Sequence, residues 1–150
     1  MPILSLVSSL LVSGSRAAIS AIHVYWAFGG SFPARSREDL GPMVVGTSQR
    51  EGMPSRAVTV AAAGIFLGAG LLPLVASGLL PSPAPLGFGR VAGAIMVGVF
   101  LARGAYGYFD TRFRPETIGT PFESLNRRFY SPLCFGLAVL SALAVAPAST

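Results

Sequence analysis

The chain contains four long apolar stretches, and their length restricts the folds that it can adopt. They cover approximately residues 3–28, 57–80, 91–109 and 130–147. At about 1.5 Å per residue, a helix over each of the first three reaches about 28 Å or more, close to the roughly 30 Å hydrocarbon core of a bilayer. Because lipid offers backbone amides no hydrogen-bond partner, each stretch is expected to be a helix. We therefore predict an all-α integral membrane protein, a four-helix bundle with a longer, partly ordered cytoplasmic loop before the fourth helix.

The composition supports a membrane protein of one domain. Of the 150 residues, 52% are hydrophobic and 11% are charged, whereas about a quarter of the residues in a soluble domain are charged. The chain has one cysteine, Cys134, and one histidine, His23. It therefore has no disulfide pair and too few ligands for a zinc site. We expect no metal site, and no feature of the sequence requires a cofactor.

The N-terminal stretch admits a second interpretation, as a signal peptide. Residues 4–12 are mainly apolar and are followed by small residues at 13–15. A signal peptide carries positive charge before its apolar run, whereas the first arginine of this chain, Arg16, follows that run. Cleavage there would also leave residues 17–28, which are too few to span a bilayer. We therefore expect the whole stretch to be a membrane span.

Arginines gather in two of the loops and predict the orientation of the protein. Loops 30–56 and 110–131 carry four arginines each, the connection between the second and third stretches carries only Arg90, and the terminal tails carry none. The positive-inside rule places both arginine-rich loops in the cytoplasm and both termini outside, in a multi-pass protein of the cell membrane, here a bacterial inner membrane. The net charge of +5 does not indicate nucleic-acid binding, because no basic patch with interleaved aromatic residues lies outside the spans.

Local signals predict how the helices end and pack. Ser131 and Pro132 have the pattern of an N-cap followed by proline at the first helical position, which would open the fourth helix. Glycine pairs with a spacing of four, at 64 and 68 and at 89 and 93, predict close helix contacts within the chain or between copies of a homo-oligomer. Loop 110–131 is long enough to fold back over the end of the bundle.

Polar and aromatic residues concentrate at the cytoplasmic end of the predicted bundle. His23 and Arg103 both lie about 8–9 Å inside the ends of their spans, counted at the helical rise. His23 could serve as proton donor or acceptor and Arg103 as an anion anchor, with aromatic side chains as walls. No catalytic residue is assigned. The candidate ligand-binding residues are His23, Tyr25, Trp26, Arg103, Tyr106, Asp110 and Cys134.

Arg16 is a secondary candidate because it lies near the middle of the first span. A charged arginine at that depth costs at least about 2.5–3.5 kcal/mol. Arg16, Ser20 and His23 share one helix face, which should point inward. None of the six acidic residues lies within a span. The buried arginines are then left with backbone carbonyls and water, or with a ligand such as a lipid phosphate, a carboxylate or a quinone oxygen.

Two segments resemble a known family. One segment is His23-Val-Tyr25-Trp26-Ala-Phe-Gly29-Gly30. The other is Thr120-Pro-Phe122 followed by Tyr130-Ser131-Pro132-Leu133-Cys134. In order, spacing and four-span layout, the chain is similar to an uncharacterised family of small bacterial membrane proteins, domain of unknown function 3995. The resemblance implies the four-span fold and implies no activity.

Two functions fit the sequence. The first is the binding of a lipid or of a quinone-like or other small molecule, by a binding protein or an enzyme, at the polar site in the cytoplasmic half. The alternative is a non-catalytic accessory or assembly subunit that interacts with another membrane protein. A proton-coupled transporter is disfavoured because the spans carry no carboxylate. Haem binding is disfavoured because no second axial ligand lies at the depth of His23.

Overall fold

The computed structural model describes residues 3–48, 50–81 and 87–145. Four helical segments in this part of the chain are long and apolar enough to cross a membrane: α1, α3, α4 and the continuous run Pro121–Val145. The predicted all-α fold with four spans is confirmed. In chain order the elements are α1 (Ile3–Ala27), α2 (Arg37–Val44), α3 (Arg56–Ala76), α4 (Phe88–Phe113), the 3₁₀ turn η1 (Pro115–Thr117), α5 (Pro121–Leu125), the π-helical turn η2 (Asn126–Tyr130) and α6 (Ser131–Val145).

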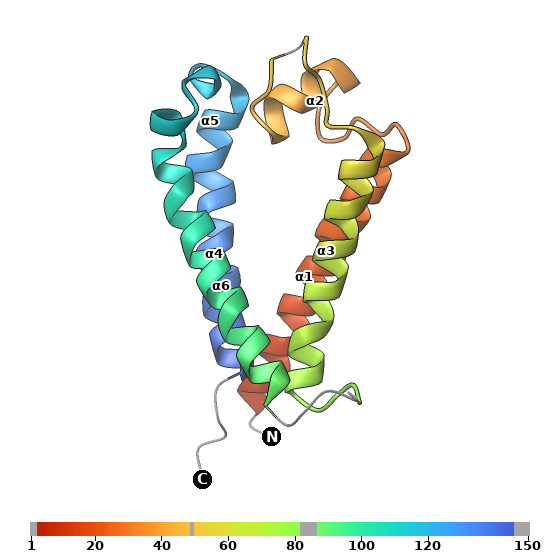
Figure 1. Ribbon diagram of the computed structural model, residues 1–150, viewed down its shortest axis with the longest axis vertical. Helices are drawn as coiled ribbons and strands as arrows, with labels where there is room; N and C mark the ends of the chain where they lie inside the picture. Colours follow the sequence, from red (N-terminus) through yellow and green to blue (C-terminus); the bar gives the residue numbers. More distant parts are fainter. Residues whose placement is uncertain (1–2, 49, 82–86, 146–150) are drawn as a thin grey trace.

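The spans form two pairs that diverge from one end of the molecule (Figure 1). α1 packs along α3, and α4 packs along α6. The pairs meet near the start of α1 and the end of α6, and they separate toward the opposite end. We call the first the terminal end. We call the second the loop end, because it carries the connections 28–55 and 114–130.

Small residues allow close helix contacts at the terminal end, between the two pairs at Gly89 and within the α4–α6 pair at Gly93. A Cβ on Gly89 would lie 2.9 Å from the Ala76 Cα, and a Cβ on Gly93 would overlap the Val145 side chain. The predicted glycine contacts of α4 are therefore present. The corresponding pair in α3, at positions 64 and 68, faces outward, since a Cβ on either glycine would meet no described atom within 4 Å.

Many of the buried side chains of the bundle are polar, whereas many of its exposed side chains are apolar. Ile65 is 71% exposed, as expected for a side chain in contact with lipid. Ser5 Oγ donates to the Ala144 carbonyl oxygen at 3.0 Å, and Ser20 Oγ donates to the Ala63 carbonyl oxygen at 2.8 Å. Lipid tails are as apolar as leucine side chains, so the hydrophobic effect does not drive such helices together. Interhelical hydrogen bonds and close packing hold them instead.

Arg16 is fully buried where the two pairs come together. Its Nη1 donates to the Ala69 carbonyl oxygen in α3 at 2.5 Å, and its Nη2 donates to Ser141 Oγ in α6 at 3.0 Å. Its guanidinium carbon lies 4.8 Å from the centre of the Phe100 ring. Neutral groups thus surround the charge, and no described carboxylate is bonded to it. The sequence left several possible partners for Arg16 open. The structure shows one of them, a backbone carbonyl, together with a serine hydroxyl and an aromatic ring.

The fourth spanning helix begins earlier than the sequence predicts. Ser131 has helical dihedral angles (φ −68°, ψ −47°) and follows a helix that already runs from Pro121. It is therefore not an N-cap, and that prediction was wrong. Pro132 has no N–H to donate to the carbonyl one turn before it. The helix widens just before this proline into the η2 turn, in which the Ser131 N–H bonds to the Asn126 carbonyl.

The segment that crosses the loop end comprises residues 31–48, which we call the strap. It contains α2, whose first turn is capped because the Asp39 N–H donates to Ser36 Oγ at 3.2 Å. α2 lies between the upper ends of the two pairs in Figure 1. Loop 110–131, which by its length could fold back over this end, is mostly helical. α4 continues to Phe113 and a new helix begins at Pro121, so α5 packs beside the strap.

Hydrogen bonds fasten the strap to both helix pairs. On the α1 side, Arg37 Nη1 donates to the Trp26 carbonyl oxygen at 3.0 Å. Trp26 Nε1 in turn donates to the Phe32 carbonyl oxygen at 2.6 Å. On the α4 side, Arg114 Nη2 donates to the Val45 carbonyl oxygen at 3.0 Å. The strap is therefore an ordered cover that bridges the two pairs where they are furthest apart.

Candidate functional site

A cavity of about 340 Å³ lies between the two helix pairs beneath the strap. α1 forms one wall, and α4, η2 and the start of α6 form the other. Its volume falls within the range of about 300–1,000 Å³ that is usual for small-molecule sites. The lining residues are Ile19, Ile22, His23, Trp26, Phe32, Pro33, Val44, Arg103, Phe129, Tyr130 and Leu133.

The cavity is largely apolar, and parts of its rim are exposed. Phe32 is 66% exposed and Phe129 is 58% exposed. No aspartate or glutamate of the described chain lines it. Its polar groups belong to a histidine, a tryptophan, an arginine and a tyrosine. A few convergent polar groups within apolar walls are typical of a ligand-binding site.

The strap separates this cavity from a groove on its other side. Val44 lines the cavity, whereas the preceding residue, Met43, lines a groove of about 550 Å³. Pro33 lines both spaces. The Tyr130 hydroxyl donates to the Met43 carbonyl oxygen at 3.4 Å. One thin segment of chain therefore divides the space between the helix pairs from the outer surface of the loop end.

His23 stands on the α1 wall with its ring held in one orientation. Nδ1 lies 2.7 Å from the Ile19 carbonyl oxygen. Because a carbonyl oxygen only accepts, Nδ1 carries the proton of this contact. The ring also contacts Trp26 and Phe66, with centroid distances of 4.9 and 5.1 Å. Nε2 is left for a ligand, as an acceptor on the neutral ring and as a donor on the protonated ring.

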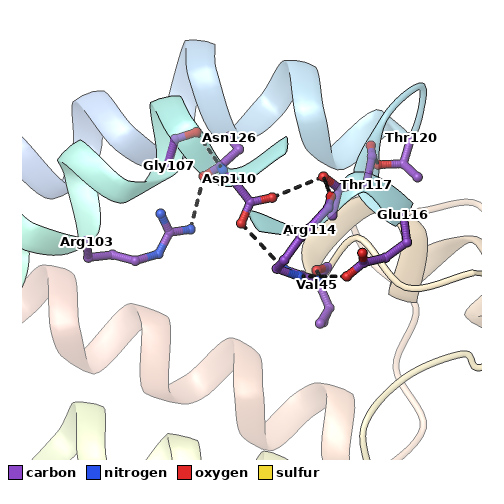
Figure 2. A network of polar contacts seen from close by, with 9 residues as sticks. All are labelled: Val45, Arg103, Gly107, Asp110, Arg114, Glu116, Thr117, Thr120 and Asn126. Carbon is purple, nitrogen blue, oxygen red and sulfur yellow. Dashed lines mark hydrogen bonds and ion pairs between the residues drawn. The ribbon is translucent and has the colours of Figure 1, made fainter. Parts of the chain in front are cut away.

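Arg103 stands on the opposite wall and has a neutral partner (Figure 2). Its Nη2 donates to Asn126 Oδ1 at 3.0 Å, and Asn126 Nδ2 donates to the Gly107 carbonyl oxygen at 3.0 Å. These two bonds fix the buried amide with its oxygen toward the guanidinium. Nη1 of Arg103 has no hydrogen-bond partner among the described residues. An amide dipole, rather than a carboxylate, therefore faces the positive charge.

Gly107 allows α4 to approach the η2 turn closely. A Cβ at this position would overlap Ser131 Oγ. It would also lie 2.9 Å from both Arg103 Nη1 and Asn126 Oδ1. The absence of a side chain is what brings Asn126 within hydrogen-bond distance of Arg103.

We expect Gly107→Ala to lower the free energy of unfolding by roughly 1–3 kcal/mol, because the added methyl group overpacks this contact. Thermal unfolding of the purified protein in a mild detergent measures the loss. Gly98→Ala is the matched control, since a Cβ at Gly98 of the same helix meets no described atom within 4 Å. Equal unfolding temperatures for the two variants would contradict the close contact between α4 and η2.

Asp110 takes part in a second network, which does not include Arg103 (Figure 2). Its Oδ2 accepts from Thr117 Oγ1 at 3.1 Å, and its Oδ1 lies 3.7 Å from Arg114 Nη1. Arg114 also donates to the strap at Val45. The carboxylate therefore closes the η1 turn and orients the arginine that holds the strap.

The structure brings three of the seven predicted binding residues to the cavity. His23, Trp26 and Arg103 line it. Tyr25 is 47% exposed and Tyr106 is 39% exposed, and neither lines the cavity. Both tyrosines lie on helix faces that are turned away from it.

The remaining predicted residues have structural surroundings. Asp110 belongs to the strap network, and Cys134 packs against a buried apolar cluster that contains Phe100 and Leu137. Arg16, the secondary candidate, contacts the same Phe100 ring and does not line the cavity.

Two polar residues of the site were not predicted. Tyr130 lines the cavity, and Asn126 orients Arg103. The signal for Tyr130 was its place in the second family-like segment. No sequence signal marked Asn126, because its side chain points toward Arg103 only as a result of the η2 turn.

The fold and the cavity define a multi-pass helical membrane protein with a candidate ligand site between its two helix pairs. The model of a family described as "Protein of unknown function (DUF3995)" matches residues 16–141, and the chain belongs to this family. Comparisons with curated proteins and with solved structures gave no match. The two segments that carry the family resemblance meet at the cavity. His23 and Trp26 come from the first segment, and Tyr130 and Leu133 come from the second.

Proposed function

We propose that this protein binds a lipophilic small molecule or a lipid in the cavity between α1 and the α4–α6 pair. The observation that carries the proposal is the cavity itself, with about 340 Å³ of space, apolar walls and polar groups on facing walls. Phe129 and Leu133, both exposed, form part of its rim. A molecule dissolved in the bilayer would therefore reach the polar groups from the side, without crossing water.

The arginine distribution supports a position for this cavity in the cytoplasmic half of the membrane. Loops 30–56 and 110–131, with four arginines each, both lie at the loop end, whereas Arg90 lies at the terminal end. By the positive-inside rule, the loop end is cytoplasmic in a bacterial inner membrane, and both termini are outside.

Trp26 provides a direct test, because it is the only tryptophan of the chain and lines the cavity. A single-chain amphiphile that carries bromine, a quencher of tryptophan fluorescence, is titrated into the protein in a mild detergent. We expect quenching that saturates and that an unlabelled amphiphile reverses.

Two substitutions in α1 distinguish the cavity from the outer surface. Ile22→Phe should fill part of the cavity and weaken binding by about tenfold or more, equivalent to about 1.4 kcal/mol. Val24→Phe is the control, because Val24 is 42% exposed and does not line the cavity. Unchanged affinity in Ile22→Phe would place the amphiphile elsewhere and contradict the proposal.

A second candidate function is that of an accessory or assembly subunit. It is favoured by one observation, the outward-facing pair Gly64 and Gly68, which leaves a narrow face of α3 open to another helix. Its test is purification from the native membrane in a mild detergent, where failure to recover a stable protein partner counts against it.

A further inference from the structure

The geometry points to a ligand with a negatively charged head. The molecule is a lipid-soluble chain that ends in a singly charged oxyanion, a carboxylate or a phosphodiester, and the head binds beside Arg103. This inference rests on the proposed function and specifies the chemical class of the ligand.

The balance of charge in the cavity is the first argument. Arg103 brings a permanent positive charge to the lining, and no described acidic residue lines the cavity. The only acid in α4, Asp110, is engaged with Thr117 and Arg114. The Asn126 amide offers Arg103 a dipole but no charge. A charge in apolar surroundings is costly unless it is paired, so an anionic ligand stabilises this site more than a neutral one.

The unused hydrogen-bonding groups are the second argument. Arg103 Nη1 and Ser131 Oγ are buried and have no partner among the described residues. A guanidinium binds an oxyanion most strongly through two parallel N–H groups. One of the two terminal nitrogens of Arg103 is already bonded to Asn126, and the other is unused. Nη1 lies enclosed beside Gly107, so an oxyanion in the cavity pairs with the charge of Arg103 from the side of the guanidinium that lines the cavity. Nη1 becomes available only if the packing at Gly107 shifts.

The arrangement of the walls is the third argument. In Figure 2 the Arg103 side chain lies on the side of α4 that is turned toward α1. His23, whose Nε2 has no hydrogen-bond partner among the described residues, lines the same cavity from α1. A head between the walls lies between Arg103 on one side and His23 on the other. Its chain then passes over the exposed rim residue Phe129 into the surrounding lipid.

The test uses three brominated probes that differ in their heads. They are a fatty acid, the fatty alcohol of the same chain length, and phosphatidylglycerol. Quenching of Trp26 is titrated in a neutral detergent, at a pH that keeps the fatty acid ionised. We expect the protein to bind the fatty acid about tenfold or more tightly than the alcohol. Competition between the fatty acid and unlabelled phosphatidylglycerol identifies the source of the oxyanion, and either source satisfies the inference.

Asn126→Asp is an informative variant, because it places a carboxylate of nearly the same shape beside Arg103, although it also loses the hydrogen bond that Asn126 Nδ2 donates to the Gly107 carbonyl oxygen. The protein then supplies its own counter-charge, so the preference for the acid over the alcohol should disappear. Arg103→Gln should remove the preference in a second way, by removing the charge. Arg90→Gln, an exposed arginine at the terminal end of α4, is the control and should keep the preference.

The outcomes separate this inference from the proposed function. Equal affinities for the acid and the alcohol in the unaltered protein would overturn the anionic head and leave the proposed function intact. A preference for the fatty acid that persists in both Asn126→Asp and Arg103→Gln would also overturn the inference. The charge of the head would then be recognised at a place other than Arg103. If none of the three probes gives saturable quenching, the proposed function itself is contradicted.

Discussion

Arg16→Ala should lower the free energy of unfolding by roughly 2–5 kcal/mol, the cost of truncating a long and fully buried side chain. Arg16 is 0% exposed and contacts three other helices, through Ala69 in α3, Ser141 in α6 and Phe100 in α4. Removal of its side chain leaves a cavity where the two helix pairs meet. Chemical or thermal unfolding in a mild detergent measures the loss.

Arg16→Met should behave differently and retain at least the stability of the unaltered protein. Methionine fills much of the same volume without a charge, and replacement of buried charges by well-packed apolar groups is often neutral or stabilising. No described carboxylate is bonded to Arg16, so the substitution leaves no buried carboxylate without its partner. The Ser141 hydroxyl can bond to a carbonyl of its own helix instead.

The contrast between these two variants tests whether Arg16 acts by its volume or by its charge. Arg90→Ala, at an exposed position of α4, is the control and should be nearly neutral. If Arg16→Met is as unstable as Arg16→Ala, the positive charge itself is required. That result would contradict the neutral environment described above.

The second large effect is expected from Arg114→Gln. The substitution removes the hydrogen bond to the Val45 carbonyl oxygen and leaves the carboxylate of Asp110, which is 3% exposed, with only Thr117. Breaking a buried ion pair costs about 3–5 kcal/mol. The Arg114 side chain is 31% exposed and its pair with Asp110 is long, at 3.7 Å, so we expect about 2 kcal/mol.

Hydrogen exchange of the strap amides measures the structural part of this effect, and unfolding measures the energetic part. We expect faster exchange over residues 31–48 in Arg114→Gln. Asp110→Asn in the same chain should restore much of the stability, because asparagine keeps the acceptor for Thr117 without a charge. Arg112→Gln, a nearby exposed arginine, is the control. Unchanged exchange in Arg114→Gln would show that other contacts hold the strap.

The depth of the candidate site within the bundle could be predicted, because depth follows from the number of residues between a side chain and the end of its span. With a fixed helical rise, the bounds of the apolar stretches predict the same depth for His23 and Arg103, and both residues line the cavity. Residue counting does not predict the direction in which each side chain points around its helix. Lipid-exposed helices are apolar on most faces, so no polar face marked the outward direction of Tyr25 and Tyr106.

Features that depend on contacts between distant segments were the ones that the sequence did not reveal. The proline at 132 was read as the start of a helix, although the same residue is compatible with a wide turn inside one. Asn126 reaches Arg103 through that turn and through the close approach at Gly107. Likewise, the strap is held by contacts with Trp26 and Arg114, which lie in different helix pairs.

The strap has a consequence for how a bound molecule is exchanged. It covers the cavity on the side of the outer groove, whereas the rim at Phe129 is exposed beside the spanning helices. A molecule in the cavity therefore leaves into the plane of the membrane rather than into water. Its occupancy depends on the number of ligand molecules per lipid molecule, not per volume of solution. Dilution of proteoliposomes with buffer leaves such a site filled, and fusion with ligand-free lipid empties it.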